Sequence, residues 1–438
     1  MLRKNPVGLD LKAYKHEELM SKNLDRINLI TIPEQNKNII AAGWFFCASF
    51  FFYAFILRVA PAVMVDDLMR EFSVGAGILG NLSAVYLYAY AGLQIPVGVC
   101  IDRFGLKGLV ASACAVCGIG CIVFSYAESL SYAYLGRVLI GAGAAFSFVG
   151  ALNMAARWFP GKFAILGGWA QMMGSAGGFV GQAPLGIAVA TFGWRLSSVA
   201  LGVAGLCLAF LLAFTVRDPK EAKTQNKPPI LYGLKKVAVN RQTWLATISA
   251  GGLTGTLLAF GGLWGVPYLM ASKNINKPES AGFVSMAFIG WAIGAPLIGW
   301  LSDLLGKRRL ILIIGSAGAC LTTITLLMFP NMPNIFLILV LGTQGALSSS
   351  MILGFALARE SNPPEMSGAA LGLINTFAVG SGAVLQPLAG YILDLQWDGT
   401  IIDGVRIYDV VHYQYALSIL PIACVLSLIA AILLKEKH

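Results

Sequence analysis

The sequence predicts an all-α integral membrane protein with twelve transmembrane helices in two pseudo-symmetric six-helix bundles. Of the 438 residues, 57% are apolar and 12% are charged, and the mean hydropathy is +0.74, far outside the range of soluble globular chains. Apolar stretches of roughly 18 or more residues recur along the chain, each long enough to cross the hydrocarbon of a bilayer. A polar interruption and an internal repeat divide these stretches into two sets of six.

Twelve apolar stretches follow one another from residue 39 to residue 434. They cover residues 39–64, 76–100, 107–127, 131–155, 163–190, 195–215, 243–271, 280–302, 309–329, 333–356, 367–393 and 412–434. None of them alternates between apolar and polar residues as the strands of a membrane barrel do. We therefore expect every crossing to be a helix.

Positive charge marks one side of the predicted membrane. Most of the 31 Lys and Arg lie in the tail 1–38, the linker 216–242, the tail 435–438 and the turns on the same side. The opposite side carries Arg70, Arg195, Lys273, Lys277 and Arg406. By the positive-inside rule both termini are cytoplasmic, and the net charge of +10 needs no nucleic acid as a partner. No cleavable signal peptide is visible, so we expect a bacterial inner membrane, with an organelle membrane as the alternative.

Two repeats relate the predicted bundles, residues 39–215 and 243–434. Gly98, Asp102 and Gly105 recur as Gly299, Asp303 and Gly306 at a constant offset of 201 residues. Span five carries Gln171, Ser175, Gly178 and Gln182 on one helix face, and span eleven carries Asn375, Val379, Gly382 and Gln386 at an offset of 204. Polar groups are costly in hydrocarbon, so we expect these faces to point inward, toward a site between two duplicated halves.

The segment Gly98-x-x-x-Asp102-Arg103-x-Gly105-x-Lys107 resembles the loop signature of the major facilitator superfamily between spans two and three, and its degenerate copy follows span eight. The resemblance implies a secondary transporter that rocks two bundles around a midplane site, without a covalent step. Two shorter segments, Arg58-Val59-Ala60-Pro61 and Gly193-Trp194-Arg195, are similar to a bacterial branch related to the lysosomal dipeptide uniporter.

The two loop motifs are interpreted as conformational elements. Their residues are Gly98, Asp102, Arg103, Gly105, Lys107, Gly299, Asp303 and Gly306. Glycines permit close helix approach, and Asp102 can accept hydrogen bonds from a helix N-terminus or pair with a cation across the seam between the bundles. The alternative is a solvated turn that only anchors topology.

Arg137 belongs to the same conformational group. Its segment resembles the superfamily's span-four motif, with Ile140 in place of a glutamine. That arginine is associated with coupling in proton-driven members, yet no Asp or Glu is embedded in a predicted span, which favours uniport or exchange. Alternatively, Arg137 snorkels outward or pairs with backbone carbonyls.

Substrate binding is predicted around Arg58, whose guanidinium could hold a carboxylate in a two-point fork. Pairing of Arg58 with Asp66 or Asp67 is the alternative. The predicted lining comprises Tyr90, Gln94, Gln171, Trp264, Gln344 and Asn375. Aromatic residues near span ends also serve as interfacial anchors, which leaves a second interpretation for the span-seven aromatics.

The predicted function is transport of a small carboxylate-bearing metabolite such as an amino acid, a dipeptide or an organic anion. A siderophore or drug exporter is the alternative within transporters, and a non-transporting membrane receptor is the alternative from another class. All eight cysteines lie in spans and the three histidines lie outside them or at an edge, so we expect no metal, no cofactor and no enzyme activity. The expected partners are the small-molecule substrate and the lipid bilayer, and we expect a monomer.

Overall fold

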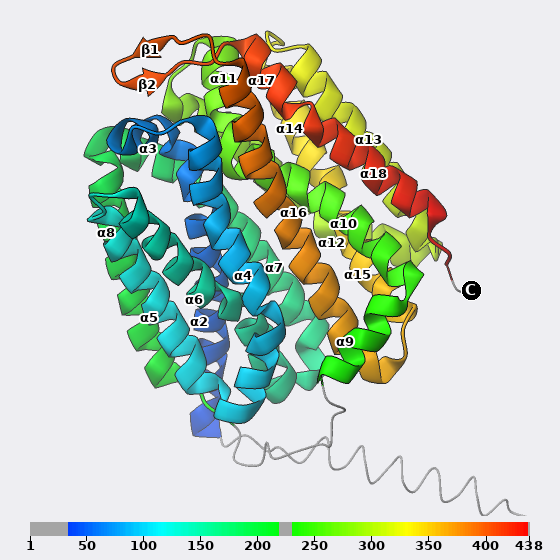
Figure 1. Cartoon of the computed structure of the whole chain (residues 1–438). Helices are drawn as coiled ribbons and strands as arrows, with labels where there is room; N and C mark the ends of the chain where they lie inside the picture. Colours follow the sequence, from blue (N-terminus) through cyan, green and yellow to red (C-terminus); the bar gives the residue numbers. More distant parts are fainter. Residues whose placement is uncertain (1–33, 219–229, 437–438) are drawn as a thin grey trace, which may run out of the picture.

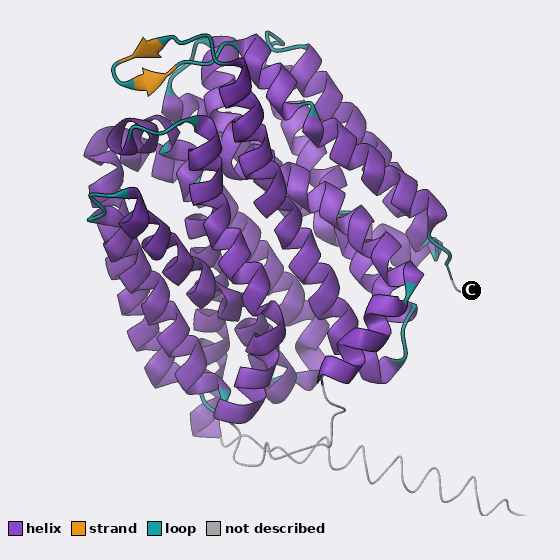
Figure 2. Cartoon of the chain, viewed as in Figure 1, coloured by secondary structure: helices purple, strands orange, loops and turns teal. Residues whose placement is uncertain are grey.

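The computed structural model describes residues 34–218 and 230–436, and helices make up nearly all of this part of the chain (Figures 1 and 2). The helices before the linker, here called the N-half, are α2 (Glu34–Val59), η1 (Ala60–Val63), α3 (Val65–Phe72), α4 (Ala76–Phe104), α5 (Leu106–Ser125), α6 (Leu130–Trp158), η2 (Pro160–Lys162), α7 (Phe163–Val180) and α8 (Ala183–Thr215). Within the predicted linker lies α9 (Ile230–Val239), whose Val237 packs against Met366 and Ala370.

The elements after the linker, here called the C-half, are again almost all helical. They are α10 (Arg241–Ala259), the π-helical η3 (Phe260–Trp264), α11 (Gly265–Lys273), α12 (Lys277–Leu305), α13 (Arg308–Met328), α14 (Asn334–Ser348), α15 (Met351–Glu360), η4 (Pro364–Met366), α16 (Ser367–Gln396), β1 (Ile401–Ile402), β2 (Val405–Arg406), α17 (Val410–Leu417) and α18 (Ile419–Leu433). Strands β1 and β2 form a small antiparallel hairpin in which Ile401 pairs with Arg406.

The described residues contain eleven helical segments long and apolar enough to cross a membrane, and one of them is long enough to cross twice. That segment, Ile165–Thr215, has 51 residues, which at the α-helical rise would measure about 76 Å, more than twice the hydrocarbon thickness. Gly193 interrupts it with φ 78° and ψ 161°, a conformation open to glycine. Gly193 therefore marks the predicted turn between spans five and six. The all-α fold with twelve crossings is confirmed.

The two halves meet along a seam at which α4 packs along α16 (Figure 1). We call the end of the molecule that carries β1 and β2 the hairpin face, and the opposite end, to which the linker attaches, the linker face. At the hairpin face the two backbones nearly touch, because a Cβ on Gly390 would lie 2.2 Å from the carbonyl oxygen of Ala76. A Cβ on Gly80 would lie 2.7 Å from that of Gln386. Glycine at these positions lets the halves close at this end.

Candidate functional site

Arg58 lies in the last turn of α2 and is buried among aromatic rings. Its guanidinium carbon is 4.4 Å from the ring centre of Phe55, 4.7 Å from that of Tyr90 and 5.6 Å from that of Tyr86. Only 6% of Arg58 is exposed, and its Nε and Nη2 atoms have no hydrogen-bond partner among the described residues. A buried guanidinium with unused donors is costly unless an anion meets it, so the geometry favours anion binding.

Neither Asp66 nor Asp67 pairs with Arg58 in the described part of the chain. Asp67 instead accepts a hydrogen bond of 2.6 Å from Nζ of Lys277, across the seam, and a looser ion pair joins it to Arg70. The helix α3 that carries both aspartates turns away from α2 after η1 (Figure 1). The carboxylates and the Arg58 guanidinium are therefore separate features of the site.

Arg137 of α6 is also buried, but its fork is used by the backbone. Nη1 donates to the carbonyl of Leu57 at 2.9 Å and Nη2 to that of Ser83 at 3.0 Å. The amide that would reach the Leu57 carbonyl in a continuous helix belongs to Pro61, which has no N–H to donate. Arg137 therefore replaces a missing helical hydrogen bond and ties α6 to α2 and α4.

The other predicted lining residues fall into separate places. Asn375 of α16 donates to Oε1 of Gln94 on α4 at 2.8 Å, which joins the halves at mid-depth. Gln344 is buried in α14 and donates to Ser348 at 3.3 Å. Gln171 is half-buried in α7 and forms no hydrogen bond with Arg58 among the described residues. The structure thus brings together Arg58 with Tyr90, and Gln94 with Asn375.

Trp264 is fully buried at the C-terminal end of η3, and its indole donates to the Gln386 carbonyl at 2.8 Å. The π-helical turn also leaves carbonyls that two glutamines reach. The side-chain amide of Gln386 donates to the carbonyl of Leu258, in its own C-half. The side-chain amide of Gln182, in the N-half, donates to the carbonyl of Gly261 in the C-half. These two glutamines are the ones that share the 204-residue offset, and both bind the same span.

The hairpin face is closed by a carboxylate of one half placed on a helix N-terminus of the other. Asp394 of α16 accepts hydrogen bonds from the amides of Ala76 and Gly77, at 3.1 and 2.8 Å, in the first turn of α4. Tyr408 donates to the same carboxylate at 2.6 Å and Arg406 pairs with it at 3.1 Å. A helix N-terminus attracts negative charge, so this contact holds the two halves together.

At the linker face each half carries its own carboxylate cap. In the N-half, Asp218 accepts from the amides of Leu106 and Lys107 at 2.8 and 3.2 Å and lies 3.5 Å from Arg157. Gly105 precedes this helix with φ 84°, and a Cβ there would meet the Asp218 carboxylate at 2.8 Å. The glycine of the loop motif is therefore required both by its backbone angle and by this close approach.

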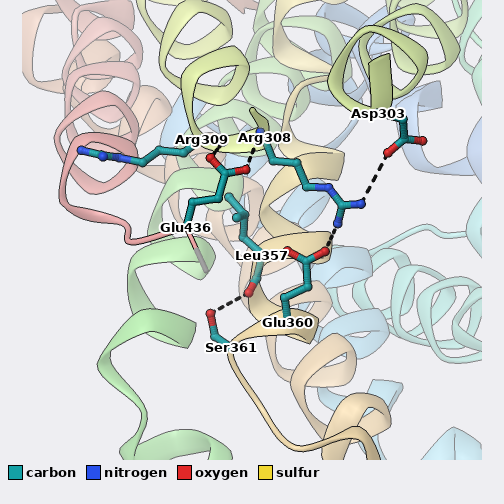
Figure 3. Close-up of polar contacts among 7 residues, drawn as sticks. All are labelled: Asp303, Arg308, Arg309, Leu357, Glu360, Ser361 and Glu436. Carbon is teal, nitrogen blue, oxygen red and sulfur yellow. Dashed lines mark hydrogen bonds and ion pairs between the residues drawn. The ribbon is translucent and has the colours of Figure 1, made fainter. Parts of the chain in front are cut away.

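In the C-half, Glu436 takes the same part at the start of α13, where it accepts from the amide of Arg308 at 2.7 Å (Figure 3). The Arg308 side chain reaches away from this cap and pairs with Asp303 and with Glu360 (Figure 3). Asp303, a predicted gating residue, is thus held within its own half. Gly306 at the end of α12 has φ 62°, which glycine adopts without strain.

The remaining motif residues lie at the linker face without cross-half contacts in the described part of the chain. A Cβ on Gly98 or on Gly299 would meet no atom within 4 Å. Arg103 is exposed and lies over the ring of Phe104 at 5.4 Å. The side chain of Asp102 lies outside the described residues.

Sequence reasoning gave no site role to Asp394, Asp218, Glu436 or Arg308. Each is a charged residue just beyond or at the end of a span, where the charge by itself indicates only a membrane boundary. A usable signal was present for one pair, because Asp218 and Glu436 both follow the last span of their half. Among the described residues, no three His, Cys, Asp or Glu side chains are grouped so that they could hold a metal ion.

The chain matches the family model described as Major Facilitator Superfamily over residues 45–274 and 253–438. It belongs to the Major Facilitator Superfamily. Among superfamily transporters, the gentisate transporter of Corynebacterium glutamicum is 26% identical over 84% of this chain and 83% of that protein. The probable galactarate/D-glucarate transporter GudP of Bacillus subtilis is 24% identical over 77% of this chain and 82% of its own length.

The fold is shared with solved superfamily structures at low identity. The inward-facing, occupied form of a bacterial homolog of the human lysosomal transporter Spinster superposes with a TM-score of 0.73 at 17% identity. The superposition covers 89% of this chain and 94% of that one. The family match and the transporter relatives identify the chain as a multi-pass membrane transporter of this superfamily rather than an enzyme.

Proposed function

We propose that the protein transports an organic anion by alternating access and holds the anion's carboxylate on Arg58. The observation that carries this proposal is the buried, unpartnered edge of the Arg58 guanidinium, formed by Nε and Nη2. These two donors have the spacing that binds a carboxylate in a planar fork. Galactarate, D-glucarate and gentisate, named for the two relatives, are carboxylates, which agrees with this choice of substrate class.

Alternating access would follow from the difference between the two faces. The cross-half hydrogen bonds lie at the hairpin face, at Asp394 and Lys277, and deeper in the seam, at Gln182 and Asn375. At the linker face, the capping carboxylates Asp218 and Glu436 bind within their own halves. If the linker face is cytoplasmic, as its Lys and Arg content favours, this arrangement is the inward-facing state of a monomer in a bacterial inner membrane.

The test of this function is binding and uptake of carboxylates by the purified protein and by an Arg58→Gln variant. Loss of charged hydrogen bonds should weaken binding by about 10- to 150-fold. Arg241→Gln, at an exposed position at the start of α10, is the matched control and should bind as the wild type does. Equal carboxylate affinity in the Arg58 variant would refute the proposal.

Uptake into proteoliposomes separates a transporter from a membrane receptor of the same fold. We expect a labelled carboxylate to enter the proteoliposomes down its own concentration gradient. We also expect it to exchange with unlabelled substrate inside them. Binding without any flux would favour the receptor alternative. Binding only of bulky amphipathic cations, with no dependence on Arg58, would favour the exporter alternative.

A further inference from the structure

The face of α2 that carries Arg58 continues toward the linker face as aromatic rings. Arg58, Phe55 and Phe51 are spaced by three and four residues, which places them on one side of the helix. The rings of Phe51 and Phe55 pack edge to face at 5.6 Å. Any group attached to an anion on Arg58, if it extends along this helix toward mid-membrane, meets these rings.

The aromatic surface extends across the seam into the other half. Phe288 of α12 lies 6.3 Å from Phe55 between ring centres, at an interplanar angle of 80°. Phe148 of α6 lies 4.7 Å from Phe51. The cluster that joins the halves here, the seam cluster, consists of Phe51, Phe55, Val59, Leu257, Ala287, Phe288 and Trp291, all buried. It supplies carbon surface and one indole N–H, with neither a carboxylate nor an amide side chain.

Two cationic side chains, Arg58 and Arg137, are buried in the described spans near the seam cluster. The terminal nitrogens of Arg137 already have hydrogen-bond partners. Both terminal nitrogens of Arg137 donate hydrogen bonds to backbone carbonyls, those of Leu57 and Ser83. The nearby amides Gln94 and Asn375 hydrogen-bond to each other. Among the described residues, Arg58 keeps two adjacent donors without a partner, whereas Arg137 keeps only its Nε. One such two-donor edge anchors one carboxylate, and a second carboxylate on the same molecule would be buried without a full counter-ion.

We propose that the substrate is a monocarboxylate with an apolar body of about the size of one ring, such as a benzoate or a cyclic aliphatic acid. This inference rests on the function proposed above and specifies its substrate. The carboxylate binds Arg58 and the body replaces part of the contact between Phe55 and Phe288 when the halves part. Each hydroxyl placed on the seam cluster without a partner would lower affinity by about 5- to 150-fold.

The test compares probes that differ in body and in charge, using the wild-type protein in nanodiscs at pH 7.5, where all the carboxyl groups are ionised. The probes are benzoate, cyclohexanecarboxylate, succinate and galactarate, and the readout is affinity by calorimetry. We expect both ring acids to bind at least about tenfold more tightly than succinate or galactarate. The opposite order, or equal affinities, would overturn the inference.

Two variants locate the body on the seam cluster. Phe288→Leu keeps an apolar side chain but removes the ring, and should weaken benzoate by about three- to tenfold while leaving succinate unchanged. Phe210→Leu is the control, since Phe210 is 64% exposed on the outer side of α8. An unchanged benzoate affinity in Phe288→Leu contradicts the assignment. If that variant does not fold, Phe55→Leu takes its place. The comparison of the four probes on the wild-type protein tests the substrate class without either variant.

The outcomes distinguish failure of this inference from failure of the proposed function. If galactarate or succinate binds best and the binding is lost in Arg58→Gln, the transporter of carboxylates stands and the apolar body is wrong. If no probe depends on Arg58, the proposed function itself is refuted.

Discussion

Asp394 at the end of α16 accepts a 2.8 Å hydrogen bond from the amide of Gly77 at the start of α4, although the two residues lie 317 positions apart in the chain. The contact joins a carboxylate of the C-half to the positive end of an N-half helix. Outward opening of the hairpin face would have to break it.

Asp394→Asn should loosen the hairpin face. The amide keeps the shape of the carboxylate but loses the charge that favours the helix N-terminus and Arg406, at a cost of about 1–2 kcal/mol. Hydrogen exchange at the amides of Ala76 and Gly77 should accelerate by about 5- to 30-fold. Asp398→Asn, in the exposed loop beyond α16, is the control. Unchanged protection of the two amides would show that Asp394 does not hold this face.

Gly390→Ala should prevent the same face from closing. The new methyl would lie 2.2 Å from the Ala76 carbonyl oxygen and 2.9 Å from the Trp264 ring, so backbone must move. We expect a loss of about 1–3 kcal/mol in unfolding free energy and a wider α4–α16 distance by spin labelling. Gly380→Ala on the same helix, where a Cβ meets no atom within 4 Å, should be neutral or slightly stabilising. Equal behaviour of the two variants would contradict the close approach.

Arg137→Met should reduce stability without reducing intrinsic affinity for the substrate. It removes the donors to Leu57 and Ser83 and leaves the Leu57 carbonyl facing Pro61, which cannot replace them. The expected cost is about 1–3 kcal/mol for the Leu57 carbonyl left without a partner, because the Ser83 carbonyl lies inside α4 and keeps its helical hydrogen bond. Thermal unfolding in nanodiscs measures the first effect and calorimetry with a carboxylate the second. A stable variant with lost binding would instead assign Arg137 to the substrate.

Asp66 should make the stability of the folded protein depend on pH. Burial raises the pKa of Asp66 above its ordinary value of 3.8, Lys277 and Arg70 offset part of this, and Asp67 adds to it. Because the folded-state pKa is the higher one, the protein loses stability as pH rises past 3.8, and the loss is complete above the raised pKa. Asp66→Asn should therefore be more stable than the wild type at pH 8 and equal to it near the acid end of the range.

Unfolding of the two proteins between pH 4 and pH 8 tests this sign. Tyr413 of α17 also faces Asp66, and Tyr413→Phe should leave the difference in place because the phenol is neutral throughout this range. A variant less stable than the wild type at pH 8 would mean that attraction to Lys277 outweighs burial.

The spans could be predicted from the sequence because hydropathy is a local property. Gly193 is an example, since the predicted break between residues 190 and 195 contains the residue at which the helix is interrupted. The buried faces also followed from helical spacing, as the burial of Gln182 and Gln386 shows. The partners of these residues were out of reach, because spacing does not reveal which helix opposes a face.

The site was less accessible to sequence reasoning for the same reason. Arg58 had two candidate partners nearby in sequence, Asp66 and Asp67, and neither contacts it, because η1 and α3 redirect the chain. Gln94 and Asn375 were identified singly, but their contact depends on how the halves are closed. The capping role of Asp394 required a contact across the seam that no local pattern contains.

The long seam between α4 and α16 converts small changes at one end into large ones at the other. Helix α4 has 29 residues, so it measures about 44 Å at the α-helical rise. A tilt of about 10° around its first turn would swing its far end by about 8 Å, by the same rise per residue. If α4 pivots near Gly77, its hydrogen bonds to Asp394 lengthen by only a fraction of an ångström. The end of α4 at the linker face then moves by about the width of a small acid.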